Sequence, residues 1–257
     1  MHAILLAGQP NRGLLKASSP TPFEAEIPVG GRAMADWVLD ALEKAPSITS
    51  IGLVGPESLK REHTTLAPMA GDLFGNILQG LSTAPVDTEH VLFLTSDIPW
   101  LTSEVIVAFL AAAPKSVDVV YPVIPKEVAE QRFPGTKRTY VRVREGVFTG
   151  GNLFLAKVQA VPRLKERAEV LLSHRKSPLT LARDLGPGLL LRLLSGHLSL
   201  RQVETRVGGI LGITGRALAF PYAEAGVDVD KPEDLALAER ELGENTHGAP
   251  EEGWDIS

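Results

Sequence analysis

An aspartate that ends a long apolar run is the first residue here whose type and position could do chemistry. Asp97 follows residues 91–96, a stretch with four consecutive apolar residues. Such a stretch, without alternation, is typical of a strand buried on both faces, as in a parallel sheet. Open α/β sheets bind ligands at the carboxyl ends of their strands, where a carboxylate can hold a divalent cation that carries phosphates. An aspartate can also simply order the turn, and this residue alone favours neither interpretation.

Two further aspartates, Asp228 and Asp230, alternate along a short extended segment nearer the C-terminal end. We expect them to point to opposite sides of that segment, so that only one of them joins Asp97 in a metal site. Each also has a purely structural alternative. Asp230 stands three residues before Glu233, with a proline between them, which is the spacing of a helix capping box. Asp228 could be a surface acid at the end of a strand.

The first loop, residues 8–16, combines small residues with Arg12 and Lys16. A loop of this kind can direct backbone N–H groups and two cations toward a polyphosphate. It is neither a P-loop nor a dinucleotide-binding fingerprint, because neither glycine pattern is present. A plain surface loop built from turn residues is the alternative interpretation.

Two glycines stand directly before an asparagine at Gly150-Gly151-Asn152. Glycines at such a point permit a close approach of the backbone to a ligand. A β-bulge or a tight turn would explain them equally well.

Strands and helices alternate along most of the sequence, which would bring these residues to one edge of a sheet. Buried strands are predicted at residues 3–7 and 91–96, and further strands at residues 50–54, 118–123, 153–156 and 216–221. Helices are predicted at residues 33–44 and 104–113, and a glycine-started loop that enters a helix is predicted over residues 71–81. A final helix ends at residue 241. This order predicts an α/β fold with a Rossmann-like, mostly parallel, doubly wound sheet.

The middle and the end of the sequence differ from this pattern. Residues 137–146 alternate polar and apolar side chains, which is typical of a half-exposed strand in a hairpin. Leucine-rich helices are predicted at residues 163–174, 179–185, 189–194 and 200–211. They form a helical insert over about 162–212, which could be a lid, a dimer interface or an acceptor-binding subdomain, although a plain cap over the sheet is the interpretation we favour. We predict one domain over residues 1–243 and a disordered tail over residues 244–257.

The composition excludes several classes of function. The sequence has no cysteine, which excludes disulfides, thiolate zinc sites and cysteine nucleophiles. Its net charge of -5 provides no basic field for nucleic acid. The apolar stretches are too short or too polar for a signal peptide or a membrane span, so we expect a cytoplasmic protein. The oligomeric state is open, with a homodimer as one expectation.

Five motifs follow one another in a characteristic order. They are a first strand ending Leu-Ala-Gly, then Ile-Pro-Val-Gly-Gly-Arg, Thr-Ser-Asp-Ile-Pro-Trp-Leu-Thr, Thr-Gly-Gly-Asn and Val-Asp-Val-Asp-Lys-Pro-Glu-Asp-Leu. As an ordered set they resemble the nucleotidyltransferase family with the glycosyltransferase A-type fold. Within it, the sequence is most similar to the molybdenum-cofactor guanylyl- or cytidylyltransferase-like group and to the sugar-phosphate nucleotidyltransferases. The resemblance extends from residue 1 to about residue 242 and is weakest over the helical insert.

The resemblance implies a reaction. An NTP would bind over the first loop, and Mg²⁺ would join its phosphates to Asp97 and to one of Asp228 and Asp230. A phosphate or hydroxyl group of a small-molecule acceptor would attack the α-phosphorus in line, and pyrophosphate would leave. Such a reaction needs mainly positioning, a metal clamp and cations near the leaving group.

The resemblance also implies roles for individual residues. It assigns Arg12 and Lys16, together with Asp97, to catalysis, and it assigns Gly151 and Asn152 to acceptor binding. It implies that the nucleotide lies against Leu6, Ala7, Gly8, Gln9, Gly71 and Asn76.

The first loop departs from the family pattern at three positions. Gln9 replaces a second glycine, Gly13 follows the arginine where methionine is usual, and Glu24 stands where a second cation is expected. An acid that faces a triphosphate would repel it. Two other functions therefore stay open: a glycosyltransferase that uses a nucleotide-sugar donor, with Asp228-Val229-Asp230 as its metal motif, and a non-catalytic relative that binds a nucleotide or a sugar phosphate.

Overall fold

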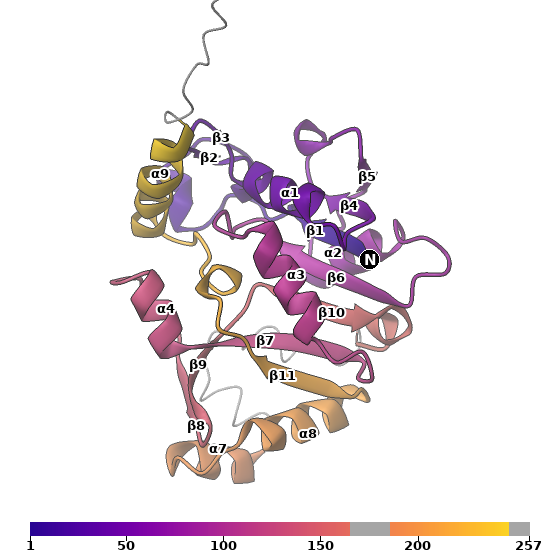
Figure 1. Cartoon of the computed structure of the whole chain (residues 1–257), viewed down its shortest axis with the longest axis vertical. Coiled ribbons are helices and arrows are strands. Elements are labelled where there is room, and N and C mark those ends of the chain that lie inside the picture. Colours follow the sequence, from indigo (N-terminus) through magenta and orange to yellow (C-terminus); the bar gives the residue numbers. More distant parts are fainter. Residues whose placement is uncertain (165–185, 247–257) are drawn as a thin grey trace, which may run out of the picture.

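A nine-stranded sheet runs through the protein, as Figure 1 shows in a computed structural model that describes residues 1–164 and 186–246. Its strands are β1 (His2–Leu6), β4 (Ser50–Val54), β5 (Thr64–Ala67), β6 (His90–Thr95), β7 (Val119–Pro125), β8 (Val141–Val143), β9 (Gly146–Gly150), β10 (Leu153–Lys157) and β11 (Gly215–Ala219). They lie in the order β5-β4-β1-β6-β10-β7-β9-β8, and β11 pairs with β7 beside this path. Only β9 and β10 run against the other strands of this sheet. The prediction of a mostly parallel α/β sheet is therefore confirmed.

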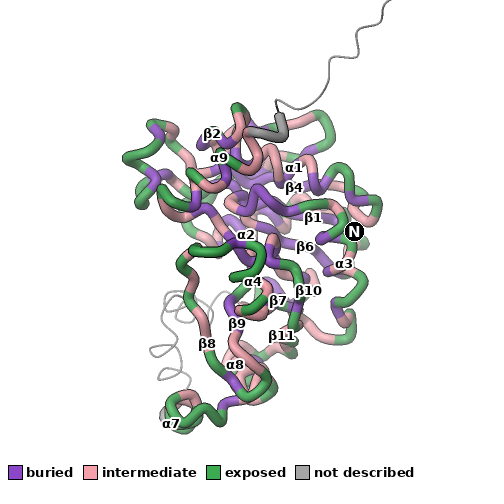
Figure 2. The backbone as a smooth tube through the Cα atoms, turned by 60° about the vertical axis from the view of Figure 1, so that its left-hand side comes forward, coloured by how far each residue is buried: buried purple, intermediate pink, exposed green. Residues whose placement is uncertain are grey.

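Helices flank the sheet on both faces. They are α1 (Met34–Lys44), α2 (Leu73–Leu81), α3 (Ser103–Ala112), α4 (Lys126–Arg132), α7 (Pro187–Leu194), α8 (Leu200–Leu211) and α9 (Pro232–Thr246). On one face, Leu39 of α1 and Phe109 of α3 pack with Leu92 of β6. On the other face, Ile77 of α2 packs with Ile4 of β1. Because side chains alternate along a strand, covering both faces explains why β1 and β6 are buried almost throughout and are apolar between their terminal residues (Figure 2).

The register of β1 and β6 decides where the loops of interest meet. The two strands are parallel, and Leu6 pairs with Thr95. The first loop therefore leaves the sheet beside the loop that contains Asp97, both at the carboxyl edge. This is the edge at which open α/β sheets bind their ligands.

A separate apolar cluster lies at this edge and joins three loops that are distant in the sequence. Leu15 comes from the first loop, Trp100 follows the Asp97 loop, and Val227 and Val229 flank Asp228. The Trp100 ring also packs on Phe133, with 4.9 Å between the ring centroids. The cluster fixes the loops relative to one another without placing apolar side chains in the site itself.

Three details of the predicted elements differ from the structure. The strand expected over residues 137–146 is short and covers only β8, because Arg138 turns inward to ion pairs instead of alternating outward. Helix α9 continues to Thr246, beyond the predicted end at residue 241 and into the predicted tail. The helices predicted at 179–185 and over most of 163–174 lie outside the described residues, whereas α7 and α8 confirm the other two. None of the helices in the described ranges is both long and apolar enough to cross a membrane.

Candidate functional site

Three carboxylates meet at the carboxyl edge of the sheet. Asp97, Asp228 and Asp230 each place one oxygen so that the three oxygens lie within 4.8 Å of one another. The expectation that only one of Asp228 and Asp230 can join Asp97 is wrong. Residues two apart in an extended segment share a side, because side chains alternate with a period of two.

Backbone hydrogen bonds hold the two acid-bearing segments together. The N–H of Val229 donates to the carbonyl oxygen of Asp97 at 2.8 Å. The hydroxyl of Thr95 donates to the carboxylate of Asp97 at 2.5 Å and so fixes its direction. On the other side, the N–H of Asn152 donates to the carbonyl oxygen of Ala225 at 2.8 Å. Main-chain hydrogen bonds between these segments, together with the Thr95 hydroxyl, therefore hold the acids in place.

Proximity and burial change the protonation of these acids. Burial raises the pKa of Asp97 to about 7, and the nearby charge of Asp228 acts in the same direction. Burial, followed by the charge of Asp230, also raises the pKa of Asp228, while Arg138 opposes this shift. Such a cluster gains stability when a cation or a proton neutralises part of its charge.

The donor set is suited to a hard divalent cation. Carboxylate oxygens are the ligands that Mg²⁺, Mn²⁺ and Ca²⁺ prefer in proteins. Within the ranges that the structure describes, this is the one group of three acidic or histidine side chains that could hold a metal ion. The residues present thus fit the Mg²⁺ that the sequence resemblance implies.

Arg138 is a residue of this site that sequence reasoning missed. Its side chain is 6% exposed, and its guanidinium donates to the Asp228 carboxylate. The same group donates to the Asp228 carbonyl oxygen at 2.6 Å and to the Asp234 carboxylate at 3.3 Å. The polar alternation around Arg138 predicted an exposed side chain, so only the surplus of acids at the site could have suggested a buried arginine.

Asp234 replaces the capping arrangement predicted for Asp230 and Glu233. Helix α9 begins at Pro232, so Asp230 is not the residue before the helix. Instead, the Asp230 N–H donates to the Asp234 carboxylate at 3.4 Å. The Asp230 side chain lies in the acid cluster instead of capping the helix, so the capping-box alternative does not describe it.

The predicted nucleotide-binding residues divide into two groups. Leu6, Ala7 and Gly8 end β1 in a buried position, and a Cβ at Gly8 would lie 3.0 Å from the Asn76 side-chain nitrogen. Asn76 is held in turn, because its side-chain oxygen accepts from the Ala70 N–H at 2.8 Å. The structure thus brings the end of β1 against Asn76 of α2.

Gln9 and Gly71, by contrast, are exposed. Gly71 has a φ of +84°, a conformation that favours glycine whether or not a ligand is present. Gln9 uses its carbonyl oxygen to accept from the Glu24 N–H at 3.0 Å, which ties the loop that follows β1 to residue 24.

The first loop presents its two cations to solvent. Arg12 and Lys16 are exposed, and no ion pair joins either one to another described residue. Glu24 lies against the same loop, since a Cβ at Gly13 would be 3.3 Å from its carboxylate oxygen. Sequence reasoning missed Asn11, whose buried amide donates to the carbonyl oxygens of Ser19 and Thr21 and closes the loop.

The predicted acceptor residues lie next to the acid cluster. The Asn152 carbonyl oxygen accepts from the Thr95 N–H at 3.0 Å, so Asn152 borders the Asp97 loop. A Cβ at Gly151 would lie 2.7 Å from the Pro122 ring and 3.1 Å from the Ala225 carbonyl oxygen. Close packing inside the fold therefore requires a glycine at position 151, whether or not a ligand binds there.

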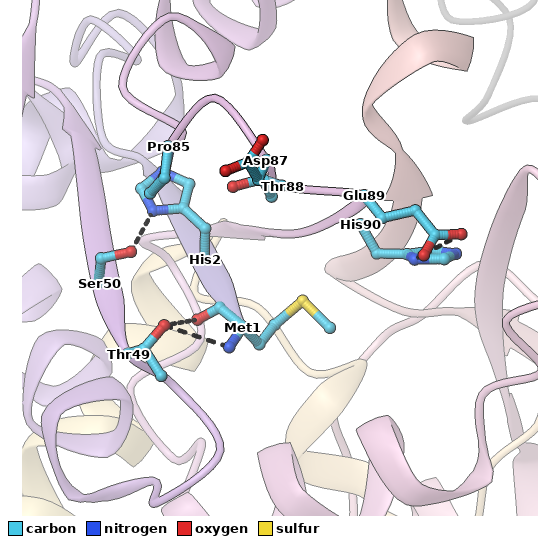
Figure 3. Close-up of a pocket in the computed structure, with 9 residues that line it drawn as sticks. All are labelled: Met1, His2, Thr49, Ser50, Pro85, Asp87, Thr88, Glu89 and His90. Atoms are coloured by element: carbon cyan, nitrogen blue, oxygen red, sulfur yellow. Dashed lines mark hydrogen bonds and ion pairs between the residues drawn. The ribbon is translucent and has the colours of Figure 1, made fainter.

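A different hollow, of about 390 Å³, lies at the opposite edge of the sheet around Met1 and His90 (Figure 3). The ring nitrogens of His2 lie 2.8 Å from the Ser50 hydroxyl and 3.0 Å from the Thr83 hydroxyl. Both nitrogens of this imidazole are thus engaged within the fold. We therefore place the candidate site at the carboxyl edge and not in this hollow.

Two solved structures with a similar architecture are synthetases of nucleotide-activated compounds. A CMP:2-keto-3-deoxy-manno-octonic acid synthetase complexed with CTP has a TM-score of 0.61 and 10% identity, covering 95% of this chain and 98% of its own. A 4-diphosphocytidyl-2C-methyl-D-erythritol synthase from Anaerococcus prevotii has a TM-score of 0.55 and 13% identity, with 94% and 95% covered. The chain therefore has the α/β fold of the nucleotidyltransferases.

Sequence comparison then gives the family. The chain belongs to the family of MobA-like NTP transferase domains, which it matches over residues 3–203. A hypothetical transferase from Thermus thermophilus is 43% identical, with a TM-score of 0.80 over 91% of this chain and 98% of that one. Comparison with curated proteins gave no match.

Proposed function

We propose that this protein is a Mg²⁺-dependent nucleotidyltransferase. It moves an NMP from an NTP to a phosphate or hydroxyl group of a small-molecule acceptor and releases pyrophosphate. The observation that carries the proposal is the convergence of Asp97, Asp228 and Asp230 at the carboxyl edge, directly beside the first loop. Membership of an NTP transferase family supports the same reaction class.

The acid cluster would hold the cation. Asp97 supplies an oxygen whose direction Thr95 fixes, and the segment of Asp228 and Asp230 supplies the others. When bound, Mg²⁺ would neutralise and orient the phosphates of the nucleotide. The raised pKa of Asp97 supports this role, because an acid that is hard to ionise alone ionises readily beside a cation.

The first loop would bind the phosphates. Arg12 offers a planar pair of donors and Lys16 a point charge, and both side chains are exposed. The nucleoside would lie where the end of β1 meets Asn76. These two contacts would set the nucleotide across the carboxyl ends of β1 and β6.

The acceptor would enter from the side of Asn152. An oxygen of the acceptor forms a bond to the α-phosphorus while the bond from that phosphorus to the bridging oxygen of pyrophosphate breaks. A hydroxyl acceptor loses its proton to water in this step. The leaving pyrophosphate keeps the electron pair and is met by the cations of the first loop. The protein thus contributes mainly positioning and charge neutralisation, which is what this class of reaction requires.

Glu24 favours a second candidate, a relative that binds a nucleotide or sugar phosphate without transferring it. Its carboxylate lies against Gly13 in the loop that would bind the phosphates. A negative charge there would weaken triphosphate binding. Binding without turnover would be the result that favours this candidate.

Pyrophosphate release tests the proposal. The purified protein is incubated with each of the four NTPs, with Mg²⁺ or with EDTA, and with a panel of sugar phosphates, polyol phosphates and unphosphorylated sugars. We expect release with one nucleotide and one acceptor class, dependent on Mg²⁺ and lost in Asp97→Ala. The control is Asp118→Ala, which removes an acid that pairs with Thr214 and Lys157 and should keep full activity. A parallel incubation replaces the NTPs with nucleotide sugars. Release of free nucleoside diphosphate there, without pyrophosphate release from any NTP, would contradict the proposal and indicate a glycosyltransferase.

A further inference from the structure

The arrangement of Arg138 goes beyond what a simple surface ion pair would need. Its side chain is nearly completely buried, and it contacts two acids, Asp228 and Asp234, which are 21% and 3% exposed. A third contact is to the carbonyl oxygen of Asp228, at 2.6 Å. The Nε–H group is buried without a hydrogen-bond partner in the described part of the chain. Burying a cation costs desolvation free energy, which close hydrogen-bonded acids must offset.

These contacts clamp the segment that carries Asp230. Asp228 precedes Asp230 and is held through both its side chain and its main chain. Asp234 follows Asp230 and accepts from the Asp230 N–H. Arg138 thus contacts an acid on each side of Asp230. The neighbouring Lys231 adds a further tie, because its ammonium donates to the Lys137 carbonyl oxygen at 2.9 Å.

The opposite side of the same segment is held by the loop that follows β6. The Val229 N–H donates to the Asp97 carbonyl oxygen, so the segment lies between the Asp97 loop and Arg138. A guanidinium is suited to this position, because its planar fork can contact several acceptors at once. A lysine ammonium has the same charge but cannot span them in the same geometry.

We propose that Arg138 is the positioning residue of the cation site. It takes Asp228 as its own partner and fixes Asp230 through Asp234, which leaves Asp97 and Asp230 as the main carboxylate ligands of the cation. This inference rests on the cation site of the proposed function and assigns different tasks to the three clustered acids. Metal sites depend strongly on such supporting contacts, whose loss costs 10–100-fold in metal affinity.

A purely electrostatic role and a positioning role of Arg138 predict opposite changes in metal affinity when the residue is removed. If Arg138 acted only as a nearby positive charge, its removal would strengthen cation binding, because it repels the metal ion. If it positions the ligands, its removal weakens binding despite the gain in negative charge. The sign of the change in metal affinity therefore distinguishes the two roles.

The test is a titration with Mn²⁺ in the absence of nucleotide, in which the electron paramagnetic resonance signal of free Mn²⁺ reports binding. We expect Arg138→Met to weaken Mn²⁺ binding by about 10-fold or more. Arg138→Lys, which keeps the charge, should also weaken it by several-fold. The matched control is Arg61→Met, which removes a partly buried arginine paired with Asp36, Asp40 and Glu43 away from the site, and it should leave the affinity unchanged.

The asparagine variants test the division of tasks. Asp230→Asn should lose more than 10-fold in Mn²⁺ affinity, because it removes a ligand charge. Asp228→Asn should lose only a few-fold, because the amide oxygen can still accept from Arg138. Equal losses in the two variants would overturn the inference.

The other possible outcomes also test either the positioning role of Arg138 or the cation site itself. Mn²⁺ binding to Arg138→Met that equals or exceeds wild type would overturn the positioning role while leaving the cation site in place. If Arg138→Met does not fold, an unchanged affinity in Arg138→Lys would overturn it in the same way. Failure of the wild-type protein to bind Mn²⁺ would instead remove the cation site, and with it both the metal dependence of the proposed function and this inference.

Discussion

The backbone N–H of Val229 donates to the carbonyl oxygen of Asp97 at 2.8 Å, although the two residues are far apart in the sequence. This hydrogen bond fixes Asp228 and Asp230, on either side of Val229, against the loop that follows β6. Three acids thereby face one another without a flexible element between them. The candidate site thus depends on strand order and loop contacts as much as on the acids themselves.

In the absence of metal, the free energy of unfolding should depend on pH because of the raised pKa of Asp97. Burial raises the pKa of Asp97 from 3.8 to about 7, so between these values the folded protein binds more protons than the unfolded chain. The free energy of unfolding should therefore fall as pH rises from about 4 to about 7. Urea unfolding in EDTA at several pH values measures this, and Asp97→Asn should flatten the curve across that window.

Mg²⁺ supplies the control for this prediction. Saturating Mg²⁺ should raise the stability of wild type at pH 7.5 more than at pH 5, because protons compete with the cation for the acids. An equal effect of Mg²⁺ on Asp97→Asn and wild type would contradict the assignment of Asp97 to the cation site.

The two cations of the first loop should affect nucleotide binding but not folding. Arg12→Ala and Lys16→Ala each remove an exposed charge that forms no ion pair with a described residue. The free energy of unfolding of each variant should therefore stay within about 0.5 kcal/mol of wild type. Each variant should weaken binding of the preferred NTP by about 10-fold, because a charge-assisted hydrogen bond to phosphate is lost. Isothermal titration calorimetry gives both affinities, with the exposed Lys60→Ala as the control. Wild-type affinity in both variants would exclude this loop from phosphate binding.

Glu24 should oppose nucleotide binding. Its carboxylate lies against Gly13 of the first loop, so Glu24→Gln removes a negative charge and keeps nearly the same shape. We expect this variant to bind the preferred NTP several-fold more tightly, and most clearly at low salt, since screening weakens the repulsion. Weaker binding would mean that the carboxylate itself contacts the ligand or its cation.

The sequence was sufficient for the fold because its buried strands are continuous apolar runs. Residues 2–6 and 90–95 are covered by helices on both faces, and that environment leaves a recognisable pattern. The cap of α3 is a local feature of the same kind, since the side chain of Thr102, a residue type preferred at helix N-caps, accepts from the Val105 N–H. Local chemistry determines such features, so no long-range information was needed.

The arrangement of the site could not be predicted in the same way. The position of Asp228 and Asp230 on one side depends on the contact of Val229 with Asp97, and the burial of Arg138 depends on Asp228 and Asp234. These are pairings between residues about 90 or more positions apart, as the separation of Arg138 and Asp228 illustrates. The alternation around Arg138 indicated an exposed strand, because local pattern does not record a distant acid that draws a side chain inward.

A thermal-shift screen tests whether Asp97 belongs to a metal-dependent nucleotide site. Wild type and Asp97→Ala are each heated with ATP, GTP, CTP or UTP, with Mg²⁺ and with EDTA. We expect one NTP to raise the unfolding midpoint of wild type only with Mg²⁺, since a ligand at 100 times its Kd adds about 2.7 kcal/mol to the free energy of unfolding. This shift should disappear in Asp97→Ala. No shift with any NTP, or an equal shift in both proteins, would contradict a metal-dependent nucleotide site at Asp97.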